Sequence, residues 1–95
     1  MAKIIWSPEG LADMQDIFDY ISNDSVRYAE RMFEGIMNKV ELLTEHPSLG
    51  RQVPEIENEF HREVFFFNYR IMYYTGRHPD IYITRVLHSS RNFKM

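Results

Sequence analysis

Apolar residues recur at the spacing of an α-helix in two long segments of the chain. In residues 9–22 the apolar positions, separated by polar and mostly acidic residues, are Leu11, Met14, Ile17, Phe18 and Ile21. In residues 26–45, steps of three and four residues join Val26, Ala29, Phe33, Ile36, Val40 and Leu43. Stripes of this kind are typical of helices that pack one face against a core. We therefore expect two amphipathic helices.

Local signals mark the ends of both helices. Ser7, which is followed by a proline, is suited to cap the first helix, and we expect that helix to end near residues 22–23. Asp24 or Ser25 can cap the second helix. The second helix must stop before Pro47, because a residue that precedes proline avoids the α conformation. So few residues join the two helices that an antiparallel hairpin is predicted.

The segments outside the helices predict strands. We expect strands at residues 2–7, 61–67, 69–75 and 80–87, and a loop over 47–60. The last three strands follow one another through short turns, so we expect an antiparallel sheet. The order β-α-α-β-β-β predicts an α+β fold with the helical hairpin packed on one face of the sheet. A length of 95 residues predicts one domain, residues 1–95.

The helices can cover only one face of this sheet, and candidate binding residues fall on the other. In the third strand Tyr69, Ile71 and Tyr73 share one face, while Arg70, Met72 and Tyr74 share the opposite face. In the last strand the two sets are Ile81, Ile83 and Leu87, and Tyr82, Thr84, Val86 and His88. We expect the uncovered face to display Arg70 and Tyr74 beside His88. Such a cluster could bind phosphate, stack on bases or contact an acidic protein. Alternatively, the arginines are solvated and the tyrosines belong to the core.

Two further features of the sequence are compatible with a bound partner protein. The run Phe65–Phe67 alternates between faces, so at least one ring should point away from the helices, and an exposed ring would suggest that a partner covers it. The apolar stripe of the second helix needs no function beyond forming the core. In the alternative interpretation, Met32 or Met37 remains uncovered and receives a partner helix.

The composition excludes several classes of site. The chain has no cysteine, which excludes disulfides and thiolate metal sites. Its four histidines lack the spacing of metal ligands, and there is no glycine-rich phosphate loop or serine elbow. We therefore expect no metal and no cofactor. The apolar run at the N-terminus is too short for a signal peptide or a membrane span, so a cytoplasmic protein without membrane contact is expected.

Charge is distributed unevenly along the chain. The formal net charge is −3. Residues 1–60 hold five Lys and Arg against twelve Asp and Glu, whereas residues 61–95 hold six against two. The net acidity argues against direct, sequence-specific binding of nucleic acid, since proteins that grip phosphates usually carry a positive charge. The basic C-terminal third is where contacts to an acidic partner are expected.

Several segments, in order and at the expected spacing, resemble the ParE branch of the RelE/ParE toxin superfamily. They are Trp6-Ser7-Pro8, His46-Pro47-Ser48-Leu49-Gly50-Arg51, Arg62-Glu63, Tyr69-Arg70-Ile71-Met72-Tyr73 and Val86-Leu87-His88-Ser89-Ser90-Arg91. The resemblance implies the toxin of a type II toxin–antitoxin system, of the kind associated with plasmid stabilisation. It also implies a cognate antitoxin that wraps the domain with an extended or helical segment.

The branch of the superfamily decides the activity that the resemblance implies. RelE-like members cleave messenger RNA in the ribosome with basic residues and a tyrosine, whereas ParE-like members poison DNA gyrase and perform no reaction. In this sequence, His61 and Glu63 stand at the two lysine positions of the RelE pattern. Ser89 stands at the position of a second arginine, and the position of the late tyrosine falls near Met95. A single matching arginine, Arg70, is a weak basis for acid–base catalysis. We therefore favour gyrase inhibition and no catalytic residue.

Two alternatives remain open at this stage. A RelE-like ribonuclease would use Arg70, His88 and Arg91, with His88 as a possible general base. His88 could equally close the last strand with a hydrogen bond of its ring. A degenerate member would bind only its antitoxin. The residues predicted to contact the target or the antitoxin are Arg62, Tyr69, Arg70, Tyr74, His88 and Arg91.

Overall fold

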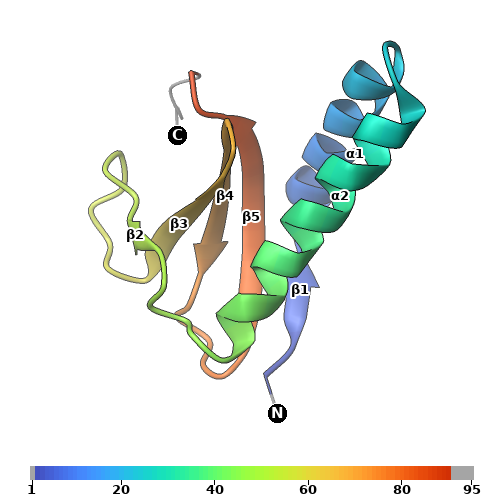
Figure 1. The fold of residues 1–95 in the computed structure, drawn as a ribbon. Coiled ribbons are helices and arrows are strands. Elements are labelled where there is room, and N and C mark those ends of the chain that lie inside the picture. Colours follow the sequence, from blue (N-terminus) through green and yellow to red (C-terminus); the bar gives the residue numbers. More distant parts are fainter. Residues whose placement is uncertain (1, 91–95) are drawn as a thin grey trace.

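A computed structural model describes residues 2–90 of the chain. Its elements are β1 (Ile4–Trp6), α1 (Pro8–Ser22), α2 (Val26–Glu41), a 3₁₀ turn (Leu42–Thr44), β2 (Arg51–Gln52), β3 (His61–Phe66), β4 (Tyr69–Tyr74) and β5 (Ile81–His88). The two helices form a hairpin on one face of the five-stranded sheet (Figure 1). The predicted α+β fold is confirmed.

Both helices begin at serine caps. The Ser7 hydroxyl accepts a hydrogen bond from the Gly10 amide (2.9 Å), and the proline after Ser7 fills the first turn. In α2 the Ser25 hydroxyl accepts from the Tyr28 amide (3.1 Å), so Ser25 and not Asp24 is the cap. Each cap satisfies an amide that the first turn leaves without a helical partner.

The sheet has the strand order β1-β5-β4-β3-β2. The pairs β2–β3, β3–β4 and β4–β5 are antiparallel, but β1 runs parallel to β5, so the expectation of an all-antiparallel sheet is wrong. Short turns dictate antiparallel pairing only for consecutive strands, and nearly the whole chain separates β1 from β5. A two-residue strand, β2, also forms inside the segment expected to be loop.

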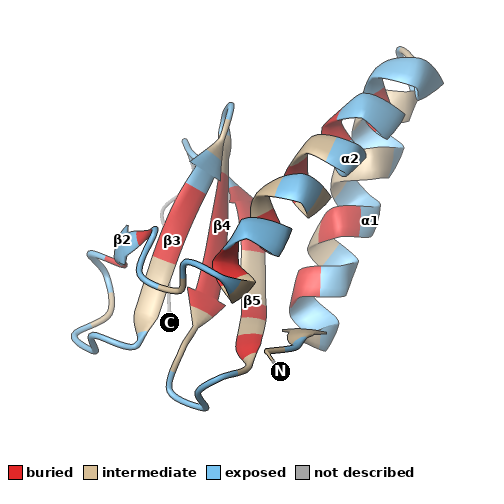
Figure 2. Cartoon of the chain, turned by 60° about the horizontal axis from the view of Figure 1, so that its bottom comes forward, coloured by how far each residue is buried: buried red, intermediate tan, exposed pale blue. Residues whose placement is uncertain are grey.

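The main core lies between the helices and the sheet. Ile36 and Leu43 on the helical side meet Ile71, Tyr73 and Ile83 of the strands, and all five are fully buried. The buried positions run along most of β4 and β5 (Figure 2). A smaller core lies on the opposite face, where Val53 and Ile56 of the segment that follows β2 pack on Met72 and Leu87.

The apolar stripe of α2 differs from the predicted one. Phe33 is 43% exposed and packs edge-on against Phe18 of α1, on the side away from the sheet, and Val26 is also exposed. Met32 is buried instead, which contradicts the alternative in which Met32 receives a partner helix. Met37 is partly buried. Part of the stripe therefore serves the contact between the two helices.

A β-bulge changes the predicted faces of β5. Met72 pairs with Arg85 while Tyr73 pairs with Ile83, so Thr84 is an extra residue at that point. Beyond it, Val86 turns into the helix-side core and Leu87 into the smaller core, opposite to the expectation. One inserted residue exchanges the faces of every position that follows.

The turn between β3 and β4 consists of Phe67 and Asn68, where the strands expected at residues 61–67 and 69–75 meet. Phe67 has a positive φ of 50° and is 74% exposed. Phe65 points away from the helices and is 40% exposed beneath the Arg51 guanidinium, whereas Phe66 packs on the core. Rings that face away from the helices are therefore present, as the alternation predicted. No helix within residues 2–90 is long and apolar enough to span a membrane.

Candidate functional site

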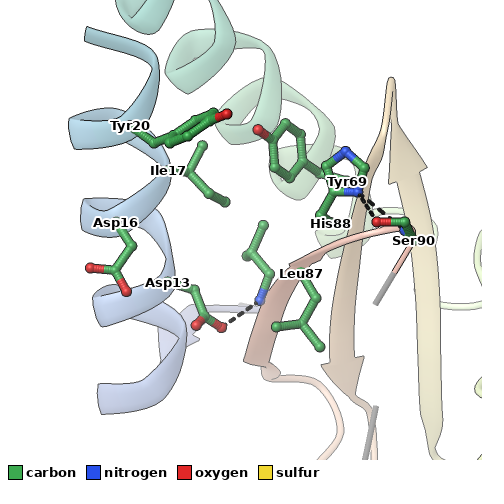
Figure 3. A pocket seen from close by; sticks show the side chains of 9 residues that line it. Asp13, Asp16, Ile17, Tyr20, Tyr69, Leu87, His88 and Ser90 are labelled. Atoms are coloured by element: carbon green, nitrogen blue, oxygen red, sulfur yellow. Dashed lines mark hydrogen bonds between the residues drawn. The ribbon is translucent and has the colours of Figure 1, made fainter. Parts of the chain in front are cut away.

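A cleft of about 520 Å³ opens between α1 and the ends of β4 and β5 (Figure 3). Tyr20 of α1 and Tyr69 of β4 face each other across it, above Ile17. A second hollow of about 290 Å³ shares Tyr20, Tyr69 and His88 with the first and continues to the exposed ring of Phe67. The two hollows together form one groove, hereafter the α1–β5 cleft.

One wall of this cleft is an open edge of the sheet. The residues of β1 pair only with Ile81–Ile83 of β5. Past that point the Ser7 hydroxyl donates to the Thr84 carbonyl (2.8 Å), and the Asp13 carboxylate accepts from the Val86 amide (2.9 Å). Among residues 2–90, no strand pairs with the outer side of β5 beyond Ile83. Side chains of Ser7 and Asp13 therefore occupy the edge at Thr84 and Val86, and the end of β5 beyond Val86 is available to an added strand.

His88 lies at the mouth of the cleft. Its ring contacts Tyr69 edge-on, with 5.6 Å between the ring centres. The Ser90 amide donates to Nδ1 of His88 (3.1 Å), and the Ser90 hydroxyl lies 2.7 Å from the same nitrogen. Burial, followed by the charges of Tyr28 and Tyr20, raises the pKa of Tyr69, which keeps this hydroxyl protonated near neutral pH. The strand end is thus closed by a ring hydrogen bond, as one of the two interpretations of His88 predicted.

Arg70 does not reach solvent as predicted. It is 5% exposed and lies under the segment after β2, where its guanidinium forms a two-bond pair with Glu55 (2.8 and 2.9 Å). It also donates to the fully buried carboxylate of Glu63 (2.8 Å), which in turn accepts from Arg51 (2.7 Å). The hydrogen bonds that Arg70 donates to Glu55, together with those to Glu63, raise the pKa of Arg70, so the guanidinium stays charged.

The predicted cluster is therefore not assembled. Arg70 belongs to the face that carries Met72 and the smaller core, while His88 packs on Tyr69 on the helical face. Arg62 donates to the Gly50 carbonyl (2.7 Å) at the far end of β3, and Tyr74 lies beside His61 on the face opposite the helices. Arg91 lies outside the described residues. Only Tyr69 and His88 of the predicted set come together.

Two residues of functional interest were not predicted from the sequence. Asp13 faces the cleft four residues before Ile17, and that helical spacing could have placed it there. Glu55, which covers Arg70, lies in an irregular segment whose sequence has no periodicity to indicate its direction. Within residues 2–90 no group of three His, Asp or Glu side chains could hold a metal ion.

Comparison with known proteins places the chain among the toxins of type II toxin–antitoxin systems. The family model described as the ParE toxin of the type II toxin–antitoxin system parDE matches residues 4–93, so the chain belongs to that family. A relative, Toxin RelE2 of Caulobacter vibrioides, is 32% identical over 91 residues, which cover 96% of this chain and 99% of the relative.

The fold also matches a solved structure. The chromosomal ParDE toxin–antitoxin system from P. aeruginosa superposes with a TM-score of 0.74 over 93% of this chain and 96% of the other, at 20% sequence identity. At that identity the likeness establishes the fold alone. Membership of the ParE toxin family makes this protein the toxin component of a type II toxin–antitoxin system and implies a cognate antitoxin.

Proposed function

We propose that this toxin inhibits DNA gyrase by binding, performs no reaction itself, and is held inactive by an antitoxin segment in the α1–β5 cleft. The observation that carries the proposal of binding without a reaction is the separation of Arg70 from His88 by the sheet. A general base and the cation that stabilises a transition state must reach the same reacting group. Groups on opposite faces of a sheet cannot do so.

The environment of Arg70 supports the same conclusion. Both of its carboxylate partners accept hydrogen bonds within 2.9 Å, and the Glu63 side chain is completely buried. An incoming phosphate would have to displace these carboxylates and leave a buried negative charge without compensation, which is costly. Arg70 is therefore proposed to hold the fold together rather than to contact a substrate.

The α1–β5 cleft supports the proposal that an antitoxin segment binds there. It combines an open strand edge with apolar and aromatic walls, and the exposed ring of Phe67 lies at its rim. An extended peptide could pair with the end of β5, beyond the Val86 amide that Asp13 occupies, and place alternate side chains between Tyr20 and Tyr69. Asp16 on the cleft wall would favour a basic residue at one of these positions. Tyr69 and His88 are the predicted binding residues that this site retains.

A RelE-like ribonuclease is the alternative, and two observations favour it. The relative from Caulobacter vibrioides carries the name RelE2, and His88 is exposed beside a tyrosine. Without Arg70, this activity would need basic groups from Arg91 or another residue beyond those described.

The experiment is an assay of the purified toxin with gyrase and supercoiled plasmid, scored for linear, cleaved DNA. We expect dose-dependent accumulation of linear DNA that disappears when the antitoxin is added first. A parallel reaction contains ribosomes with a bound messenger RNA. Cleavage of that RNA without any effect on gyrase would overturn the proposal in favour of the ribonuclease. Inactivity in both assays from a folded, antitoxin-free sample would also contradict it, and would indicate a degenerate member.

A further inference from the structure

A row of aromatic rings crosses three strands on the face of the sheet opposite the helices. His61 of β3 pairs with Tyr74 of β4, and Tyr74 pairs with Tyr82 of β5. The ring centres of His61 and Tyr74 lie 4.8 Å apart, and Phe60 meets Tyr74 edge-on at 6.3 Å. Register partners in adjacent strands point to the same side, so the ring of Tyr82 lies on the same face as those of His61 and Tyr74. These three rings are hereafter the aromatic platform.

The platform is open. The segment after β2 covers the other half of this face, where Val53 and Ile56 lie on Met72 and Leu87. Beside the rings lies a hollow of about 400 Å³, lined by Asn58, His61, Tyr74, Arg77, Tyr82 and Thr84. The hollow is therefore bounded by polar loop residues at its rim and by rings on its floor.

Packing within the sheet accounts for the positions of the rings. It does not provide hydrogen-bond partners for the polar groups in this hollow. Within the described part of the chain, no hydrogen bond is made by the hydroxyls of Tyr74 and Tyr82, by the His61 ring or by the Arg77 guanidinium. The Tyr74 hydroxyl lies so close to Gly76 that a Cβ there would come within 2.0 Å of it. Glycine at this position leaves the ring room to lie over the turn that carries Arg77.

We propose that this hollow binds a nucleotide, with its base stacked on the rings of Tyr74 and Tyr82 and its phosphate paired with Arg77. Aromatic side chains on an exposed sheet stack unpaired bases without regard to sequence, and a guanidinium forms two parallel hydrogen bonds with phosphate. Thr84 and Asn58 supply polar groups at the rim for the edge of the base. The inference concerns a different face from the α1–β5 cleft and goes beyond the proposed function.

The chemistry of the hollow defines the ligand further. Burial lowers the pKa of His61, so its ring is neutral near pH 7 and offers an uncharged stacking surface. Among residues 2–90, Arg77 is the one arginine or lysine that lines this hollow, so stacking should contribute more than charge. We therefore expect a ligand the size of one nucleotide, bound with a weak dependence on salt. The source is either a free mononucleotide or the unpaired end of a nucleic acid strand.

The test is a titration of the purified full chain with AMP, followed by the amide chemical shifts of β3, β4 and β5. Ribose 5-phosphate, which lacks the base, serves as the matched ligand. We expect AMP to shift these amides and ribose 5-phosphate to leave them unchanged. Equal effects of the two compounds would overturn the stacking proposal, as would the absence of any shift at millimolar AMP.

Variants locate the site. Tyr82→Leu and Arg77→Gln should each weaken AMP binding about tenfold, the loss expected when one stacking ring or one phosphate contact is removed. Phe65→Leu, an exposed ring on the same face outside the hollow, is the control and should bind as the wild type does. Arg77→Gln remains informative if Tyr82→Leu unfolds, which circular dichroism detects. Wild-type affinity in folded Arg77→Gln and Tyr82→Leu proteins would refute the site.

A fluorescein-labelled hexamer of deoxyadenosine, measured by anisotropy, distinguishes the two sources. Tighter binding of the hexamer than of AMP would identify a strand end, and equal affinity would identify the free nucleotide; both results support the inference. Failure of the gyrase assay would leave the nucleotide titration unaffected, so the two proposals can fail separately.

Discussion

The Asp13 carboxylate of α1 accepts a hydrogen bond from the backbone amide of Val86 in β5, with 2.9 Å between Oδ2 and the nitrogen. The same carboxylate accepts two hydrogen bonds from the Arg85 guanidinium, at 2.8 and 3.1 Å. An amide at this point of an edge strand would otherwise face the α1–β5 cleft without a strand partner. A helix side chain therefore takes the place of β1 just where β1 has ended.

Replacement of Asp13 by alanine should reduce the free energy of unfolding by about 1–3 kcal/mol, because the Val86 amide is left without its acceptor. Asp13→Asn keeps an acceptor oxygen, so its loss should be smaller. Asp16→Ala, an exposed position on the same helix, is the control. Urea denaturation measures all three variants. Equal stability of Asp13→Ala and Asp16→Ala would show that the contact contributes nothing.

Arg70 and Glu63 form a buried ion pair, so replacing one partner alone should lower the free energy of unfolding. Arg70→Met leaves the carboxylate of Glu63 buried with one partner fewer, and breaking such a pair typically costs about 3–5 kcal/mol. The double variant Arg70→Met, Glu63→Leu removes both charges and should recover much of that loss. The four proteins of this cycle are compared by urea denaturation. A double variant no more stable than Arg70→Met would contradict a direct coupling of the two residues.

The buried position of Arg70 corrects an expectation drawn from the sequence. Arg70 was expected on the uncovered face of the sheet, among the residues that contact the target or the antitoxin. Because it is buried between two carboxylates, its substitution is now expected to affect stability first. Any loss of toxicity in an Arg70 variant must therefore be compared with its fraction folded.

His61 should make stability depend on pH below neutrality. Burial lowers its pKa in the folded protein from the ordinary 6.5, so the unfolded chain binds a proton more readily. Stability from this group is complete above pH 6.5 and is lost as the pH falls through the lowered folded pKa. His61→Gln should flatten the stability curve below pH 6.5, as measured by urea denaturation at a series of pH values. Parallel curves for the wild type and the variant would rule out this contribution.

The sequence was sufficient where structure depends on neighbouring residues. The serine caps at Ser7 and Ser25 fix the helix starts through contacts three residues away, so the first residues of both helices were predicted correctly. The second helix ends at Glu41, earlier than the stripe to Leu43 indicated. The β3–β4 turn at Phe67 is equally local. The resemblance, carried by short motifs in a fixed order, identified the family that the comparisons support.

The sequence was insufficient where distant segments meet. The bulge at Thr84 exchanges the faces of Val86 and Leu87, and nothing in the sequence of β5 marks it. The uncovered face was assumed to be bare, but the segment with Val53 and Glu55 returns to cover half of it. Because of these two long-range effects, Arg70 was wrongly placed beside His88.

The proposal for the antitoxin depends on the α1–β5 cleft and can be tested without knowledge of the target. Tyr20 is 77% exposed, so Tyr20→Ala removes one wall of the cleft with little effect on folding. A well-packed contact of this size in a peptide groove contributes about 2 kcal/mol or more, so the antitoxin should dissociate at least about tenfold faster. Surface plasmon resonance measures the dissociation rate.

Phe65→Ala is the matched control, because this ring is exposed on the opposite face of the sheet. Its dissociation rate should equal that of the wild type. His88→Ala should resemble Tyr20→Ala, because His88 lies at the mouth of the same cleft. If Phe65→Ala weakened the complex and Tyr20→Ala and His88→Ala did not, the antitoxin would occupy the face that carries the aromatic platform. The cleft would then be left for the toxin's target.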